Sequence, residues 1–476
     1  MFFITICAAS DSGGMELKMK QTSERLGLKI VGGLQEVTTA WSGVALLVDL
    51  YRTLKLTELG NRVLPAKKSA KGLQSGQTVE SFVLLNALGG ENNADMQRLR
   101  EDAGLVELLG YQPPAPETAR QWLDRFHDES LMQPECQQES FIPRESSGLA
   151  GLREINKRII SGYIQSQKPG PEVTLDIDSQ LIETYKAEAH YCYEHYKAYQ
   201  AMKVVWAETM LVVNEEFRDG NVYVGKDLQR MVDEAIQALP AGSWQIQIRS
   251  DSAAYDMDTL DHWDRQHWKF AVSAAMNANL EREVKKLAEE DWQEWQRDKR
   301  GVIHEWAEVA FVPGRKYEQK ERQPYRYVAV RLRQPQGSFF HEGTTVRHYA
   351  IVTNRWDLTG AELVAWQRGK AGTVEQVHHV LVSDLAGRVF PSYKYGVNAA
   401  WLRLQVITYN LLELLKKAAL PEEYHQAHPK RLRFAVFSGV GRVIRHGGQL
   451  LLRITTAMLE RLLAPGRRRI ALLDSG

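Results

Sequence analysis

The chain has 476 residues, of which 44% are hydrophobic and 25% charged, and its formal net charge is +1. This length predicts two to four domains of ordinary globular composition. The near-zero net charge excludes a globally basic surface, so any nucleic-acid binding depends on local patches. Cys7, Cys136 and Cys192 lie far apart without paired spacing, which argues against a disulfide framework and a zinc site and predicts a cytoplasmic location.

The apolar N-terminal run MFFITICAAS has no basic leader and is too short to span a bilayer. We therefore expect residues 1–34 to form an N-terminal extension, in which residues 1–14 precede a true start at Met15. Charges interrupt the other apolar stretches, such as LLVDLYRTL and LLELLKKAAL, so we expect no membrane segment.

Residues 35–165 have a helical pattern and are predicted to form a DNA-binding region. QTVESFVLLNALGG carries apolar residues at helix spacing and stops at a Gly-Gly pair. A Pro-rich turn then precedes ETARQWLDRFHDE, in which Pro116 suits the start of a helix. Two interpretations stay open for these short helices: a helix-turn-helix that places Arg120 and Arg125 on DNA, and a small bundle with solvated arginines.

A polar linker within 131–170 precedes a strand-rich succession. VTLDIDSQLI, AMKVVWAETM and LVVNEEFRDGNV predict three strands, the last closed by an Asp-Gly-Asn turn. An amphipathic helix follows in GKDLQRMVDEAIQALP, then strands in SWQIQIRSD and HWKFAVSAAM, and a charged helix over 277–300. Three strands, helix, strand, helix, strand is the order of a ribonuclease-H-like mixed α/β sheet, so residues 166–300 are predicted to be the first part of such a core.

Residues 301–356 are predicted to form a β-rich insertion, because HEWAEVAFVP, PYRYVAVRLRQ and TVRHYAIVTNR alternate in hydropathy. One face of the middle strand carries valines and a leucine, and the other carries Tyr327, Arg331 and Arg333. Contact of this second face with a DNA backbone and an ordinary solvated sheet face both stay open.

Helical sequence returns over 357–420, which we assign to the second part of the core. Residues 421–476 are rich in arginine and are predicted to be a basic tail. In a nucleic-acid-binding protein such a tail favours phosphate contact.

Three acidic residues carry the chemistry. Asp178 and Asp251 end apolar, strand-like runs, and Glu375 lies in the helix-like stretch GKAGTVEQVHHV. Mg²⁺ prefers hard oxygen ligands, and two such ions about 3.5–4 Å apart support an in-line phosphoryl displacement. The first and fourth strands of a ribonuclease-H-like sheet are neighbours, so we expect the two aspartates to meet and a crossing helix to deliver Glu375. The three acids predict an enzyme that cuts and joins nucleic acid strands.

Alternatives remain for each acid. Asp176 shares a strand face with Asp178, and either can bind the metal; we favour Asp178, at the strand end, with Asp176 in a supporting position. Taken alone, Asp251 also suits a turn cap and Glu375 a solvated helix surface. The pair His378-His379 lacks nearby cysteine ligands, which disfavours zinc.

The stretches TLDIDSQLIE, IRSDSAAY, GKAGTVEQVHHVLVSDLAGR and YGVNAAWLRLQVITYNLLELL resemble, in order and spacing, those of bacterial insertion-sequence transposases of the DDE type. The resemblance runs from about Met15 to the C-terminus and is to the group with a β-strand insertion before the last acid. It implies a ribonuclease-H-like core in which Asp178, Asp251 and Glu375 hold Mg²⁺, with Mn²⁺ able to substitute. It also implies binding to double-stranded DNA at terminal inverted repeats and at a target, a homodimer on DNA, and cut-and-paste transposition.

The chain departs from this family pattern in two places. The family usually has a lysine two helical turns after the last acid, where this chain has Val382. The tyrosine and arginine that commonly precede the acid are replaced by Trp366, Arg368 and Lys370 at the nearest positions. The candidates for the missing DNA contacts are Arg368, Lys370, His378 and His379. Two rivals therefore stay open: a non-catalytic DNA-binding protein derived from a transposase, and a metal-dependent nuclease of the same fold.

Overall fold

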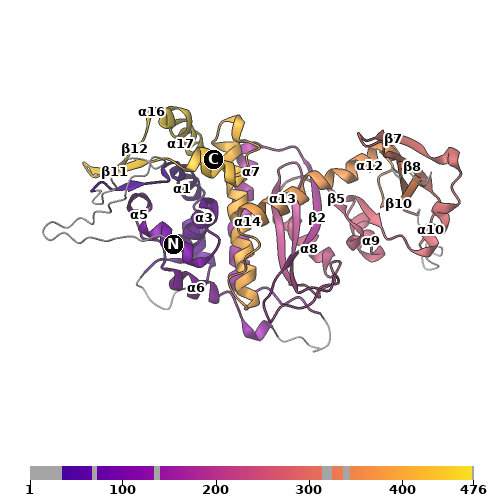
Figure 1. The fold of residues 1–476 in the computed structure, drawn as a ribbon, viewed down its shortest axis with the longest axis horizontal. Coiled ribbons are helices and arrows are strands. Elements are labelled where there is room, and N and C mark those ends of the chain that lie inside the picture. Colours follow the sequence, from indigo (N-terminus) through magenta and orange to yellow (C-terminus); the bar gives the residue numbers. More distant parts are fainter. Residues whose placement is uncertain (1–34, 67–71, 133–139, 314–323, 336–343, 474–476) are drawn as a thin grey trace, which may run out of the picture.

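The computed structural model describes residues 35–66, 72–132, 140–313, 324–335 and 344–473. A helical part, a central sheet and a strand extension follow one another along the longest axis of the molecule (Figure 1). The predicted extension upstream of Met15, as well as Cys7 and Cys136, lies outside the described residues. Within the described ranges, no helix is both long and apolar enough to cross a membrane.

The N-terminal part is helical, as its sequence predicts. Helix α3 stops where Gly89 takes a left-handed conformation (φ 89°), which glycine adopts without steric cost. Helix α6 begins at Pro116, the predicted start. The helices are α1 (Ala45–Thr53), α2 (Leu56–Val63), α3 (Ser75–Leu88), α4 (Met96–Glu101), α5 (Ala103–Leu109), α6 (Pro116–Asp124) and α7 (Ser147–Gln167).

The long helix α14 (Tyr395–Ala418) lies between the helical part and the sheet (Figure 1). Nearly all of its residues are buried, as expected for a helix that is covered on every side. It packs against α7 and α3 on one side and against strand β4 (Leu211–Asp219) on the other. Asn410 accepts a hydrogen bond from the Val212 amide (2.9 Å) and donates one to the Val212 carbonyl (2.8 Å). The amide side chain thereby satisfies the backbone of an edge strand.

Nine of the described strands form one sheet in the order β4-β3-β2-β5-β6-β10-β9-β8-β7. Its first five strands are antiparallel from β4 through β3 to β2 and parallel from β2 through β5 to β6. This is the predicted ribonuclease-H-like mixed sheet. The strands are β2 (Glu172–Glu183), β3 (Ala198–Trp206), β5 (Gln245–Ser250) and β6 (Lys269–Ala274), and the helices between and after them are α8 (Leu228–Gln237), α9 (Met257–Arg265) and α10 (Ala278–Lys285).

The predicted insertion strands are present and continue the core sheet, because β10 pairs with β6 in antiparallel register. The extension consists of β7 (Gln293–Arg297), β8 (Ile303–Val309), β9 (Arg326–Pro335) and β10 (Thr344–Thr353). The prediction of one charged helix over 277–300 is wrong in its second half. Helix α10 ends at Lys285, and β7 pairs with β8 as the last strand of the sheet.

Three helical segments follow the extension: α12 (Gly360–Arg368), the single turn η6 (Gly369–Gly372) and α13 (Val374–Asp384). Helix α13 packs against β2 and β3, so the predicted helix with Glu375 does cross the central strands.

The segment predicted as a basic tail is folded onto the N-terminal helices (Figure 1). Its hairpin of β11 (Gly441–His446) and β12 (Gln449–Arg453) forms a second sheet with β1 (Thr38–Thr39). Arg467 pairs with Asp49 (2.5 Å) and Arg445 with Glu107 (2.7 Å). Helices α15 (Pro429–Leu432), α16 (Thr456–Met458) and α17 (Ala464–Ala471) complete this part.

Candidate active site

The structure brings Asp178 and Asp251 together on neighbouring parallel strands. Ile177 pairs with Ser250 across β2 and β5; Asp178 is the next residue of β2, and Asp251 is the residue directly after the end of β5. Burial raises the pKa of Asp178, and the charge of Asp251 adds to this effect. Asp251 also caps the turn η4 (Ser252–Ala254), since its Oδ1 accepts a hydrogen bond from the Ala253 amide at 3.0 Å. A fixed pair of close carboxylates favours the binding of a cation.

A lysine already supplies positive charge at this pair. Lys370 Nζ lies 3.4 Å from Asp178 Oδ2, and both side chains are largely buried. Lys370 belongs to η6, directly before α13. The predicted DNA contact of Lys370 is therefore replaced, in this structure, by an ion pair with the proposed metal ligand.

Glu375 lies in the first turn of α13, and its side chain is exposed. Across the described residues, no group of three or more His, Cys, Asp or Glu side chains is arranged to hold a metal ion. The backbone thus carries Glu375 toward the central strands without placing its carboxylate in a ligand group with the two aspartates. Exposed His379 lies one turn further along, 6.2 Å from the ring of His428.

The hydrogen-bond partners of Asp176 differ from those of Asp178. It is fully buried, and its two oxygens accept hydrogen bonds from Arg249 Nε (2.6 Å) and Nη2 (2.7 Å). The Thr373 hydroxyl also donates to Asp176, which ties the start of α13 to β2. A bidentate pair with arginine uses the lone pairs that a metal would need. The geometry therefore favours Asp178 over Asp176 as the ligand.

Two buried basic residues lie close to the candidate site: the sequence analysis did not single out Lys203, and it predicted that His378 contacts DNA. Lys203 on β3 pairs in register with Asp178, and burial lowers the pKa of Lys203 to about 7. His378 is buried beneath α13, and burial, with the charges of Lys203 and Lys370, lowers its pKa well below the usual value. Its Nε2 has no hydrogen-bond partner among the described residues. The interpretation of His378 as a DNA contact is wrong for this structure, because the ring is inside.

The arginine face predicted on β9 is turned inward. Arg331 is buried and pairs with Glu305 (2.7 Å) and Glu289 (2.7 Å), and its guanidinium lies 4.3 Å from the centroid of the Trp292 ring. Arg333 also pairs with Glu305, at 2.7 Å. Both open interpretations of this face, DNA contact and solvation, fail for Arg331, because Glu289, Trp292 and Glu305 surround its guanidinium.

The other arginines predicted to contact DNA differ in how accessible they are to a ligand. Arg120 is exposed but pairs with Glu117 (2.6 Å) and Asp124 (3.2 Å) of its own helix. Arg125 is exposed and lines a hollow of about 760 Å³ in the helical part. Arg368 lies 2.7 Å from His304 Nδ1. Arg125 thus has the best access to a ligand among these three.

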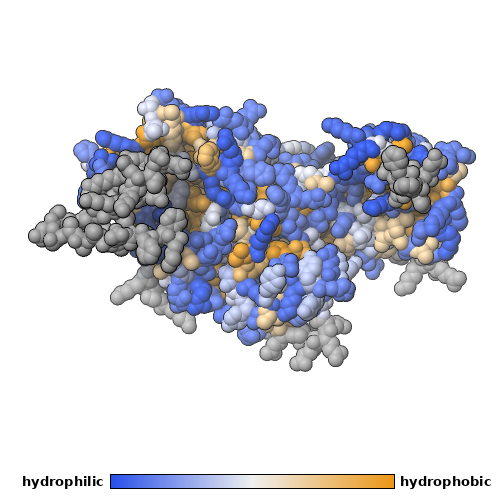
Figure 2. Space-filling model, in the orientation of Figure 1, coloured by the Kyte–Doolittle hydropathy of each residue, from blue (hydrophilic) through white to orange (hydrophobic). Residues whose placement is uncertain are grey.

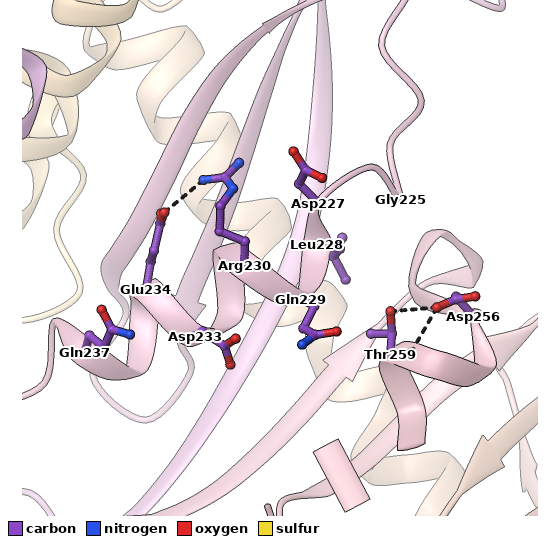
Figure 3. A pocket seen from close by; sticks show the side chains of 10 residues that line it. All are labelled: Gly225, Asp227, Leu228, Gln229, Arg230, Asp233, Glu234, Gln237, Asp256 and Thr259. Carbon is purple, nitrogen blue, oxygen red and sulfur yellow. Dashed lines mark hydrogen bonds and ion pairs between the residues drawn. The ribbon is translucent and has the colours of Figure 1, made fainter. Parts of the chain in front are cut away.

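A second hollow, of about 700 Å³, lies between α8 and α9 (Figure 3). Four of its lining residues are acidic: Asp227, Asp233, Glu234 and Asp256. The single arginine among its lining residues pairs with Glu234 at 2.9 Å. The negative charge of this hollow does not suit a phosphate, and none of the predicted site residues lines it. Elsewhere the visible face is mostly hydrophilic, with apolar residues exposed in small groups (Figure 2).

The protein thus has a ribonuclease-H-like fold, with an aspartate at matching places on two adjacent central strands. Residues 31–473 match the family model described as Transposase DDE domain group 1, and the chain belongs to this family. It is a DDE-type transposase.

Solved structures of other transposases are similar to this chain over part of its length. One is a piggyBac transposase synaptic complex with hairpin DNA, at 11% identity and a TM-score of 0.43, covering 82% of this chain and 80% of that one. Another is the Mos1 strand transfer complex, at 15% identity and a TM-score of 0.15, covering 43% and 60%. A search of the curated proteins finds no match.

Proposed function

We propose that this transposase cleaves DNA strands and joins them to a target by metal-dependent phosphoryl transfer at Asp178 and Asp251. The observation that carries the proposal is the position of the two aspartates at matching places on adjacent parallel strands of the core, with the Lys370 ammonium 3.4 Å from Asp178. Their hard oxygen donors suit Mg²⁺, with Mn²⁺ as a substitute.

Glu375 would supply a third donor once α13 or its side chain adjusts, since this helix begins at the residues that contact Asp176 and Asp178. When bound, the metal supplies Lewis-acid activation of the attacking and leaving oxygens in an in-line displacement. Lys370 would then be released from Asp178, and its ammonium would be available to a DNA phosphate next to the site.

The protein's own groups have separate tasks in this proposal. Asp251 is held by the Ala253 amide, so its carboxylate is fixed before substrate arrives. The Asp176–Arg249 pair fixes β2 against β5, and hence the spacing of the two aspartates. We further propose that the DNA is double-stranded and carries terminal inverted repeats, and that a homodimer holds the two ends.

The test is cleavage of the element's own DNA ends by the purified full chain in Mg²⁺. Wild-type protein is expected to nick and join, whereas Asp178→Asn, Asp251→Asn and Glu375→Gln are expected to bind the ends but leave them uncut. Full cleavage by any one of these variants would remove that residue from the proposed site.

A second candidate is a transposase-derived protein that binds DNA without cutting it. It is favoured by the Lys370–Asp178 ion pair, the exposed Glu375 and the presence of Val382 at the family's lysine position. In the same assay this protein would retard the DNA ends and leave them intact at every Mg²⁺ or Mn²⁺ concentration. A nuclease of the same fold would cut but give no joined product.

A further inference from the structure

Three tyrosines near the candidate active site expose their rings to solvent. Tyr191 and Tyr193 lie in the segment 184–197 between β2 and β3, and Tyr223 lies in the segment 220–227 between β4 and α8. Their exposed fractions are 66%, 70% and 66%. We call these three residues the tyrosine surface. Several large aromatic rings exposed on neighbouring segments favour a binding surface, because each leaves a large apolar face in water.

The segment that presents Tyr191 and Tyr193 is held in one conformation. Buried Ala189 and Cys192 anchor it to the body of the protein. The Cys192 amide donates to the Tyr196 carbonyl (2.9 Å), and the His195 amide donates to the Cys192 carbonyl (3.0 Å). The backbone that carries the two rings is therefore held before any ligand binds, which lowers the entropic cost of binding. Lys197 Nζ lies 5.9 Å from the centroid of the Tyr191 ring.

The 220–227 segment lies against the turn that follows Asp251, and the 184–197 segment follows the end of β2, the strand that carries Asp178. Partial burial raises the pKa of Tyr193, and the negative charges of Glu194 and Asp251 add to this effect. A Cβ on Gly225 would lie 2.5 Å from the Ala253 carbonyl oxygen and 2.6 Å from the Tyr223 ring. The Tyr223 segment thus packs directly against the turn that Asp251 caps.

The two segments also touch each other. A Cβ on Gly220 would lie 2.5 Å from the Ala198 carbonyl oxygen and 3.2 Å from the His190 carbonyl oxygen. His190 Nδ1 in turn lies 3.6 Å from Asp219 Oδ2, at the end of β4. The two segments that carry the three tyrosines are therefore neighbours, and one of them contacts the turn after Asp251.

We propose that the tyrosine surface binds unpaired bases of the DNA strand at the cleavage point, by stacking them on its rings. The inference rests on the proposed function, because strand cleavage and transfer leave bases unpaired next to the aspartates. Glu188 and Glu194 offset the lysines of the 184–197 segment, so ring faces rather than net charge supply the attraction. Stacking tolerates any base, since every base has a π face.

The test is the affinity of the full chain for a short fluorescent single strand, measured by anisotropy without divalent metal. The double variant Tyr191→Ala/Tyr193→Ala is expected to bind roughly 100-fold more weakly, at about tenfold per ring. Tyr191→Phe/Tyr193→Phe keeps both rings and is expected to bind as the wild type does. Tyr393→Ala is the matched control, because Tyr393 is similarly exposed (62%) but lies near Arg120 in the helical part.

Three results would overturn the proposal: single-strand affinity unchanged in the double alanine variant, loss of affinity in the phenylalanine variant equal to that in alanine, or equal loss in Tyr393→Ala. A change of oligomeric state in the alanine variant with unchanged DNA affinity would assign the surface to a protein partner and also refute it. Thermal unfolding of each variant identifies a folding defect. The proposed function fails separately, through absence of Mg²⁺-dependent cleavage by the wild type.

Discussion

Replacing Arg249 by methionine tests whether Asp176 has a structural role that differs from the metal-binding role proposed for Asp178. Asp176 is completely buried, and Arg249 Nε and Nη2 lie 2.6 and 2.7 Å from its oxygens. Removing one partner of a buried ion pair leaves an uncompensated charge and costs about 3–5 kcal/mol. We expect Arg249→Met to lower the free energy of unfolding by that amount, and Asp176→Asn to lower it by more than about 1 kcal/mol.

Asp178 is the matched comparison, two residues along the same strand. Burial and Asp251 raise its folded-state pKa above the unfolded value, so the ionised form is disfavoured by folding at neutral pH. Its ion pair with Lys370 is looser, at 3.4 Å. Asp178→Asn should therefore change stability by less than about 1 kcal/mol, or increase it, when no metal is present.

The assay is urea unfolding at about pH 7 in chelator, where both aspartates are ionised in the unfolded chain. The double variant Asp176→Asn/Arg249→Met should recover part of the loss, because no buried charge is then unpaired. The reasoning is refuted if Asp178→Asn is more destabilising than Asp176→Asn, or if Arg249→Met costs less than about 1 kcal/mol.

Three further outcomes are expected. Because the pKa of His378 is lower in the folded state than in the unfolded chain, the free energy of unfolding should fall as the pH drops below about 6.5, by up to about 1.4 kcal/mol per pH unit. His378→Leu should flatten this dependence, as measured by urea unfolding between about pH 7 and pH 5. Arg403→Met should cost about 3–5 kcal/mol in the same assay, because it leaves buried Glu215 unpaired at the contact of α14 with β4; a loss below about 1 kcal/mol would contradict this. Arg331→Gln should lower the unfolding midpoint, because the Arg331 guanidinium is bound by Glu305. The affinity for duplex DNA should stay within about twofold of the wild type in a gel-shift titration. A selective loss of DNA affinity would support the predicted DNA contact instead.

The core strands could be predicted from sequence because each is a short apolar run bounded by turn residues. Their order alone indicated the mixed sheet, and the adjacency of Asp178 and Asp251 followed from it. The start of α6 at Pro116 and the stop of α3 at Gly89 were likewise local properties of the chain. These predictions needed no information about distant contacts.

The errors arose where pairing is long-range. Strand β7 is short and polar (QEWQR), so its sequence resembles the end of the charged helix before it, and only pairing with β8 makes it a strand. The β11–β12 hairpin is completed by β1, which has two residues and lies some 400 positions earlier in the chain. No local pattern carries such a contact.

The sequence could predict only part of the candidate site, because the rest depends on long-range strand pairing. Alternation placed Asp176 and Asp178 on one face of β2 but could not tell which one meets Arg249, since that depends on the β2–β5 register. A lysine within the apolar run AMKVVW was a signal for a buried charge at Lys203, because charged residues are rarely buried without partners. The inward turn of Arg331 depends on Glu289 and Glu305, which lie in other segments.

The central claim is that Asp178 and Asp251 bind a divalent cation. Titration of Mn²⁺ into the full chain, followed by electron paramagnetic resonance, tests it without requiring DNA or turnover. We predict that wild-type protein and Asp176→Asn, where the latter is folded, bind Mn²⁺ with similar affinity, whereas Asp178→Asn and Asp251→Asn lose at least about tenfold. Undiminished Mn²⁺ binding by Asp178→Asn and Asp251→Asn, or loss confined to Asp176→Asn, would contradict the account.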